Sequence, residues 1–165
     1  MMQKKTLPRI LFLLYGALML WLLFFQSARI PEYGTASYWQ QVKSNLNLTP
    51  LRTVGNYLHV LTNREYYLEK WGFASIYAFQ ARQAVINLGG NVGMFIPLGL
   101  FLPWVFTNLR KAWKTLLTAA GIIILVEVLQ LFTLLGSCDV DDLILNLVGV
   151  WLGYGTFFIL SKVNE

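Results

Sequence analysis

Four long apolar stretches constrain the fold of this chain more than any other feature. Transmembrane helices need roughly 17–25 apolar residues, and a segment inside lipid must close its backbone hydrogen bonds internally. The chain is also 56% hydrophobic and only 13% charged, which is unusual for a soluble domain of this length. We therefore predict a single all-α integral membrane domain over residues 1–165, with spans at about 10–25, 85–106, 113–135 and 143–160.

The first and second stretches each have a feature that refines this prediction. The first is short enough to be a signal peptide, but Gln26-Ser27-Ala28 is a poor cleavage site, so an uncleaved anchor is preferred. The second is rich in glycine and contains Pro97, so it should be kinked and closely packed against another helix. The fourth stretch carries Gly149 and Gly153, which predict a similar close approach.

Basic residues flank the apolar stretches on one side of the predicted bundle. The loop between the third and fourth stretches has three aspartates and no base, whereas the other short flanks contain Lys4, Lys5, Arg9, Arg110, Lys111, Lys114 and Lys162. The positive-inside rule then places both termini in the cytoplasm of a multi-pass plasma-membrane protein. The net charge of +5 is explained by orientation and by contact with membrane lipids, so we expect no nucleic-acid partner.

Residues 27–84, here called the outer segment, would lie on the opposite side of the membrane. Its second half mixes charged residues with aromatic ones, namely Tyr66, Tyr67, Trp71, Phe73, Tyr77 and Phe79. Because Tyr and Trp favour the headgroup level, this aromatic-rich segment predicts one or two interfacial helices on the outer leaflet. A compact lid over the bundle is the equally weighted alternative.

Glu127 lies inside the third apolar stretch and is the strongest functional clue. It precedes the outer end of that stretch by eight residues, which is a depth of ~12 Å at ~1.5 Å per helical residue. Gln130 follows on the same helical face. A carboxylate at that depth is costly, so it is normally paired, turned inward or functional.

Other polar residues should gather near Glu127 at the outer end of the bundle. Asp142 and Asn146 are four residues apart on the fourth stretch, as Asn87 and Asn91 are on the second. With Asp139 and the counter-charge Arg52, they predict a polar, outward-opening pocket with the ligand-binding candidates Arg52, Asn87, Asn91, Glu127, Gln130, Asp139, Asp142 and Asn146. Arg82 is a second possible counter-charge.

Each of these residues also has a structural explanation. Asp139 or Asp141 would serve well as a helix N-cap, and the amides would serve as hydrogen bonds between helices. Neighbouring acids should raise the pKa of Cys138 and make its thiol inert. No second ligand accompanies His59, so we predict no metal site and no cofactor, although a hard cation held by carboxylates is an alternative.

The motifs, taken in order, resemble the VanZ family. They are Leu46-Asn-Leu-Thr-Pro50, Arg52-Thr-Val-Gly-Asn56, Asn87-Leu-Gly-Gly-Asn91, Phe95-Ile-Pro97-Leu-Gly99, Glu127-Val-Leu-Gln130 and Asp139-Val-Asp-Asp142 with Asn146 and Gly149. The resemblance covers roughly residues 10–160 and implies a bacterial envelope membrane protein, with low-level teicoplanin resistance as the family association. Family members need no acid at Asp141, so the resemblance favours Asp139 and Asp142 as site residues.

We therefore favour an accessory or binding protein that affects glycopeptide tolerance. Its ligand would be a lipid-linked envelope precursor or a lipid-tailed glycopeptide. The alternative is a membrane hydrolase or transferase on an envelope lipid that uses Glu127 with Asp139 or Asp142 as catalytic residues. No nucleophile–base pair, metal motif or phosphate loop supports this enzyme, so an enzymatic role ranks second. A membrane-protein partner docked on the glycine-rich helices is a third hypothesis.

Overall fold

The computed structural model describes residues 6–26 and 37–163, and four long apolar helices dominate it. They are α1 (Thr6–Trp21), α5 (Ala74–Val105), α6 (Ala112–Thr133) and α7 (Val140–Val163). A π-helical turn, η2 (Leu22–Gln26), extends α1. Four helical segments, namely Thr6–Phe24, α5, α6 and α7, are long and apolar enough to cross a membrane, which confirms the predicted all-α membrane fold.

The shorter elements lie mostly in the outer segment and the connections. They are α2 (Tyr38–Ser44), β1 (Leu46–Asn47), α3 (Arg52–Thr62), α4 (Arg64–Trp71), the 3-10 turn η3 (Thr107–Leu109) and β2 (Cys138–Asp139). Residues 27–36 of the predicted outer segment and the basic residues Lys4 and Lys5 lie outside the described residues.

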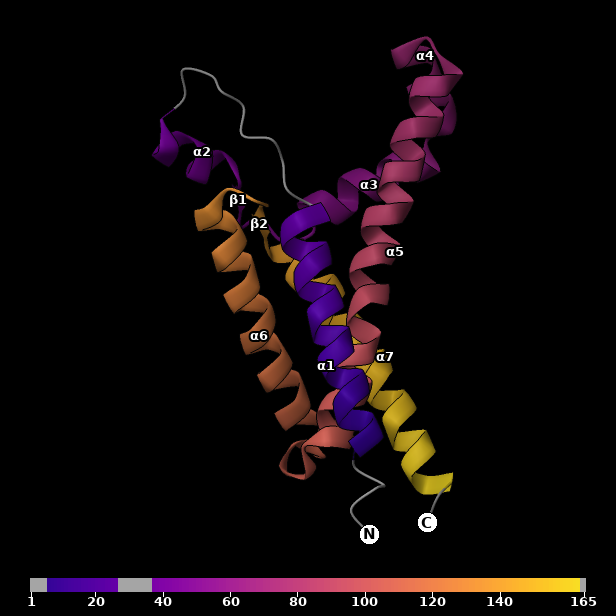
Figure 1. Cartoon of the computed structure of the whole chain (residues 1–165). Coiled ribbons are helices and arrows are strands. Elements are labelled where there is room, and N and C mark those ends of the chain that lie inside the picture. Colours follow the sequence, from indigo (N-terminus) through magenta and orange to yellow (C-terminus); the bar gives the residue numbers. More distant parts are fainter. Residues whose placement is uncertain (1–5, 27–36, 164–165) are drawn as a thin grey trace.

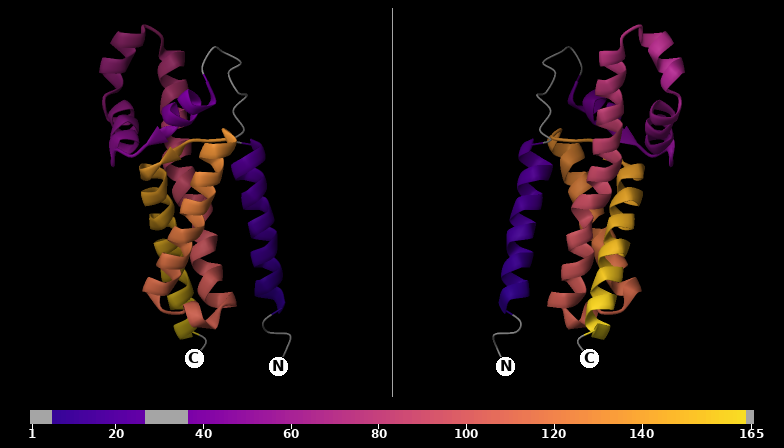
Figure 2. Two further views of the ribbon diagram at one scale, coloured as in Figure 1. Left: turned by 90° about the vertical axis from the view of Figure 1, so that its left-hand side faces the viewer. Right: turned by 90° about the vertical axis from the view of Figure 1, so that its right-hand side faces the viewer.

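The four long helices run lengthwise beside one another (Figure 1). The beginning of α1, the α5–α6 connection and the end of α7 share one end of the bundle, and the two strands with α2 and α3 lie at the other (Figures 1 and 2). The basic end therefore holds Arg9, Arg110, Lys111, Lys114 and Lys162. Large apolar side chains such as Leu13, Leu117 and Trp151 point outward and are more than half exposed, as lipid-facing positions require.

Glycines set the closest helix contact, between α5 and α7. A Cβ atom at Gly99 would lie 1.9 Å from the carbonyl oxygen of Val150, and one at Gly149 would lie 2.1 Å from that of Val92. A Cβ atom at Gly153 would lie 1.9 Å from the carbonyl oxygen of Ile96. The backbones thus touch directly, which is how small residues hold membrane helices together where no hydrophobic effect drives association.

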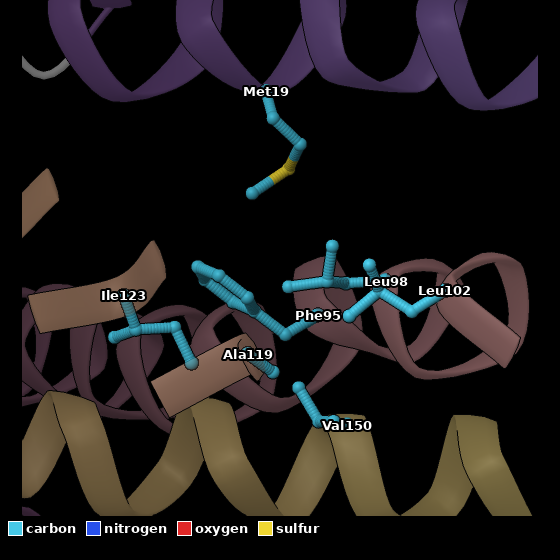
Figure 3. Packing of buried hydrophobic residues seen from close by; sticks show 7 residues of the cluster. All are labelled: Met19, Phe95, Leu98, Leu102, Ala119, Ile123 and Val150. Carbon is cyan, nitrogen blue, oxygen red and sulfur yellow. The ribbon is translucent and has the colours of Figure 1, made fainter. Parts of the chain in front are cut away.

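Helix α1 packs mainly on α5 and lies at the side of the bundle formed by α5, α6 and α7 (Figure 2). Figure 3 shows Met19 of α1 reaching toward Phe95, which belongs to a buried cluster with Ile123 and Val150. The hydroxyl of Tyr15 also donates a 2.8 Å hydrogen bond to the carbonyl oxygen of Met94. Contacts of Met19 and Tyr15 therefore hold α1 against α5.

The outer segment combines a covering part and a projecting part. The covering part joins the bundle through the parallel pair β1–β2, in which Leu46 pairs with Cys138 and Asn47 with Asp139. The hydroxyl of Tyr38 also donates to the carbonyl oxygen of Phe132 at the end of α6. The projecting part is α4 with the first turns of α5, which begins well before the expected span (Figure 1). Its placement at the headgroup level stays a prediction.

Candidate functional site

A cavity of about 700 Å³ opens between η2, α5, α6 and the start of α7, in the half of the bundle that carries residues 37–73. Its polar lining includes the predicted residues Asn87, Asn91, Glu127, Gln130, Asp142 and Asn146, together with Gln83 and Ser137. Its apolar lining is Leu22, Leu23, Ile86, Met94, Phe95, Ile123 and Val126. The cavity therefore pairs a polar group of side chains with an apolar wall, as a site for an amphiphilic molecule would.

Glu127 reaches the cavity from α6 and is only 8% exposed. Its Oε2 atom accepts a hydrogen bond from the backbone N–H of Asp139 at 3.4 Å. That long bond ties the carboxylate to the start of α7, where the N-terminal end of the helix dipole favours negative charge. No salt bridge to Glu127 occurs in the described part of the chain.

Asp142 and Asn146 reach the same cavity from α7. The Nδ2 group of Asn91 on α5 donates to the Oδ1 atom of Asp142 and so links the two helices. One turn deeper, Asn146 is 3% exposed, and its Oδ1 atom has no hydrogen-bond partner. Among residues 6–24 and 37–163, it is the only buried side-chain oxygen or nitrogen atom without a hydrogen-bond partner. Buried acceptors are rarely left unpaired, so this atom needs an explanation.

Gln130 lines the cavity but also joins two elements. Its Nε2 group donates a 2.7 Å hydrogen bond to the carbonyl oxygen of Leu23, in the π-helical turn after α1. Its own carbonyl oxygen accepts from the N–H groups of Leu135 and Gly136 as α6 ends. Gln130 therefore fixes the outer end of α1 against α6, and with it one wall of the cavity.

Asp139 lies beside the cavity and is engaged in structural hydrogen bonds. Its Oδ1 atom accepts from the N–H of Asp141 at 2.9 Å, which caps the start of α7. Its Oδ2 atom accepts from the hydroxyl of Thr53 at 2.6 Å and from the side chain of Asn47 at 3.1 Å. One carboxylate thus caps α7 and attaches the outer segment to the bundle.

Asp141 is fully buried and caps a different helix. Its carboxylate accepts hydrogen bonds from the backbone N–H groups of Leu51, Thr53 and Val54, where α3 begins. Leu51 adopts a left-handed conformation, with φ of 61°, that helps to turn these N–H groups toward one carboxylate. The sequence analysis predicts a capping role for Asp141 as an alternative, but it identifies neither the helix that Asp141 caps nor Asn47 and Thr53 as partners of Asp139.

Arg52 and Arg82 are both exposed and do not line the cavity. No lysine or arginine does, and in the described part of the chain no salt bridge joins Arg52 to the acidic residues. Asn87 stands at the outer edge, where its Nδ2 group donates to the carbonyl oxygen of Gln83. The structure thus gathers the predicted residues of α5, α6 and α7 and leaves Arg52 outside.

Cys138, in β2 beside the cavity, has a thiol whose pKa is raised. Burial is the main cause, and the negative charges of Glu127, Asp139 and Asp142 add to it. Both effects disfavour the thiolate, in agreement with the inert thiol predicted from the sequence.

Alkylation of Cys138 is expected to be slow in the folded protein. As the chain has one cysteine, iodoacetamide labelling reports on this thiol alone. At pH 8 the rate should be several-fold lower than in the denatured protein and should increase with pH, because a raised pKa reduces the thiolate fraction. Asp142→Asn should speed labelling, whereas Glu69→Gln on the exposed face of α4 should not. Equal rates in folded and denatured protein would contradict the expectation.

Comparison with known proteins agrees with the fold and the motifs. A model of the VanZ/LLP1 family matches residues 12–161. Over 161 residues the chain is 26% identical to Protein VanZ of Enterococcus faecium, an alignment that covers 96% of this chain and 78% of that protein. No solved structure matches the chain. Because the family model spans nearly all of the chain and the sequence motifs occur in order, this four-helix membrane protein belongs to the VanZ/LLP1 family.

Proposed function

We propose that this protein is an accessory protein of the bacterial envelope that affects glycopeptide tolerance, with teicoplanin as the drug of interest. It would act by binding a lipid-linked envelope precursor or a lipid-tailed glycopeptide in the cavity described above. The observation that carries the proposal is the joint lining of that cavity by the carboxyl groups of Glu127 and Asp142 and by apolar side chains.

The shape of the site favours an amphiphilic ligand. Leu22 and Leu23 of η2 line the cavity together with Met94 and Phe95 of α5, so an acyl chain would meet apolar surface. Asp142 lies in the first turn of α7 and Glu127 accepts from the N–H of Asp139, whose strand pairs with the outer segment, so a polar head would remain at the end that carries this segment.

The charge distribution supports the proposed orientation in the plasma membrane. Basic residues are concentrated at the end where α1 begins and α7 ends, so the positive-inside rule puts that end in the cytoplasm. The cavity and the outer segment then face the outside, where glycopeptides and their targets are found. Both termini would be cytoplasmic.

A tolerance assay tests this proposal. A deletion strain would carry the wild type, Glu127→Gln, Asp142→Asn or Arg52→Ala at matched membrane levels, with teicoplanin and vancomycin as the tailed and untailed drugs. We expect Glu127→Gln and Asp142→Asn to lose most of the teicoplanin protection, because each replaces a carboxyl group that lines the cavity by an amide. Arg52→Ala should have the smaller effect, since Arg52 lies outside the cavity.

Glu69→Gln provides the matched control, because it makes the same chemical change on an exposed face of α4. It should protect as well as the wild type. Equal protection by the wild type against both drugs would refute recognition of an acyl tail. Full protection by Glu127→Gln and Asp142→Asn would mean that the cavity is not the site of function.

An enzyme acting on an envelope lipid is the second candidate, because Glu127 and Asp142 share one cavity and such a pair can divide acid and base roles. Asp139 is less suited to catalysis, as both of its carboxylate oxygens accept hydrogen bonds within the protein. Incubation of the purified protein with labelled envelope lipids would distinguish the candidates. A product that forms with the wild type and not with Glu127→Gln would establish the enzyme.

A further inference from the structure

We propose that the cavity recognises an ammonium group, and that its ligand is therefore an amine-bearing molecule rather than one with an anionic head. This inference rests on the proposed function, in which the cavity binds an amphiphilic ligand, and it specifies the chemistry of the polar head. The ammonium could belong to a lipid headgroup or to a free amine, and the experiment below separates these sources.

The first argument is the charge of the lining. Glu127 and Asp142 both face the cavity, and no lysine or arginine does. Arg52 and Arg82, the residues that would hold a phosphate or carboxylate, are exposed and lie elsewhere. An anionic head would enter an acidic, partly buried site without a counter-charge, which like-charge repulsion and desolvation both oppose.

The second argument is the unpaired acceptor. The Oδ1 atom of Asn146 is buried, has no donor within reach and belongs to a residue that lines the cavity. An unpaired buried acceptor is costly, so a bound ligand that donates a hydrogen bond to it would offset this cost. Asn146 is thus an independent sign of a ligand, beyond the presence of the two acids.

The third argument is that side-chain amides in the cavity lining already donate hydrogen bonds to other protein groups. Asn91 donates from its amide to Asp142, Gln130 donates to the carbonyl oxygen of Leu23, and Asn87 donates to that of Gln83. These three side-chain amides thus donate within the protein. In the described part of the chain, the second carboxyl oxygens of Glu127 and Asp142 and the Oδ1 atom of Asn146 accept no hydrogen bond. An ammonium group has three hydrogen-bond donors, no acceptor and a positive charge, so it is complementary to these free acceptor oxygens.

A metal ion matches the site less well. In the described part of the chain, no group of three His, Cys, Asp or Glu residues is arranged to hold one. Asp139, the third acid near Glu127, is already bonded to Asn47, Thr53 and the N–H of Asp141. An ammonium needs fewer carboxylates than a divalent cation does, because its own N–H groups can reach neutral acceptors such as Asn146.

Thermal unfolding of the purified full chain in detergent micelles tests the inference, because a ligand that binds the folded state raises Tm. The probes are phosphatidylethanolamine, its N-acetylated form, phosphatidylglycerol, ethanolamine and MgCl2. We expect phosphatidylethanolamine to raise Tm and the N-acetylated lipid and phosphatidylglycerol to have much less effect. A shift with ethanolamine alone would also support the ammonium site and would identify a free amine as a sufficient ligand.

Asn146→Leu is the informative variant, because it removes the unpaired acceptor and keeps the same number and branching of side-chain heavy atoms. Its Tm without ligand should equal or exceed that of the wild type, since no buried acceptor is left unpaired. Its apparent Kd for the amine should nevertheless increase by about tenfold or more, as for a lost hydrogen bond to a charged group. Glu69→Gln should behave as the wild type.

The outcomes separate this inference from the proposed function. Equal shifts with amine and N-acetylated lipid, or a preference for phosphatidylglycerol, would overturn the ammonium site while leaving lipid binding intact. A shift with MgCl2 alone would overturn it in favour of a metal ion. No shift with any probe would count against both the ammonium site and lipid binding in the cavity.

Discussion

Replacing Gly153 by alanine is expected to prevent the bundle from closing and to cause the loss of most folded protein. The new Cβ atom would lie 1.9 Å from the carbonyl oxygen of Ile96 and 2.9 Å from the amide nitrogen of Leu100. Both atoms belong to the backbone of α5, so no side-chain rotation can relieve the clash. Overpacking commonly costs about 1–3 kcal/mol, and a contact between two rigid backbones should lie at or above the top of that range.

Gly155→Ala is the matched control, two residues further along the same helix. Nothing lies within 4 Å of a Cβ atom built at this position, and alanine is favoured over glycine in a helix by about 1 kcal/mol. We therefore expect Gly155→Ala to be as stable as the wild type or more so. The measurement is monodisperse yield and Tm in micelles, and similar values for the two variants would contradict the packing seen between α5 and α7.

Length and hydropathy predicted the four helices, because a bilayer permits few alternatives. The same information could not say which glycines make contact. Helix α5 contains four glycines in this region, and only Gly99 lies against the backbone of α7. The other three are Gly89, Gly90 and Gly93. That choice depends on the rotation of α5 about its axis, and the glycine-rich run of this helix is spread over several of its faces.

The convergence of Glu127, Asp142, Asn91 and Asn146 could be predicted, because polar groups avoid lipid and turn to the interior of a bundle. The different structural roles of the three aspartates could not be predicted from the sequence. Asp139, Asp141 and Asp142 are close in sequence, but their roles depend on where α3 and β1 settle, which are contacts to a segment about 90 positions away. The sequence predicts Arg52 as a counter-charge in the site, but the structure puts it at the exposed start of α3, outside the cavity. The position of α3 depends on the same distant contacts.

Asp141→Asn is expected to release the outer segment from the bundle. The Asp141 carboxylate accepts from three backbone N–H groups at the start of α3, and the amide nitrogen of asparagine would turn two hydrogens toward them. Hydrogen bonds to a charged group are worth about 1.5–3 kcal/mol each, and a helix cap about 1 kcal/mol, so a loss of about 2 kcal/mol or more follows. Hydrogen–deuterium exchange of peptides that contain Leu51, Thr53 and Val54 would measure the effect.

Ser37→Ala is the matched control for Asp141→Asn, because Ser37 caps the neighbouring helix α2 from an exposed position. It should cost about 1 kcal/mol or less and leave exchange in α3 unchanged. In Asp141→Asn the exchange should rise in α3 and β1, while α5 and α7 stay protected, since their glycine contacts do not involve the outer segment. Unchanged protection of α3 would show that something other than Asp141 holds it, and the left-handed Leu51 would then need another cause.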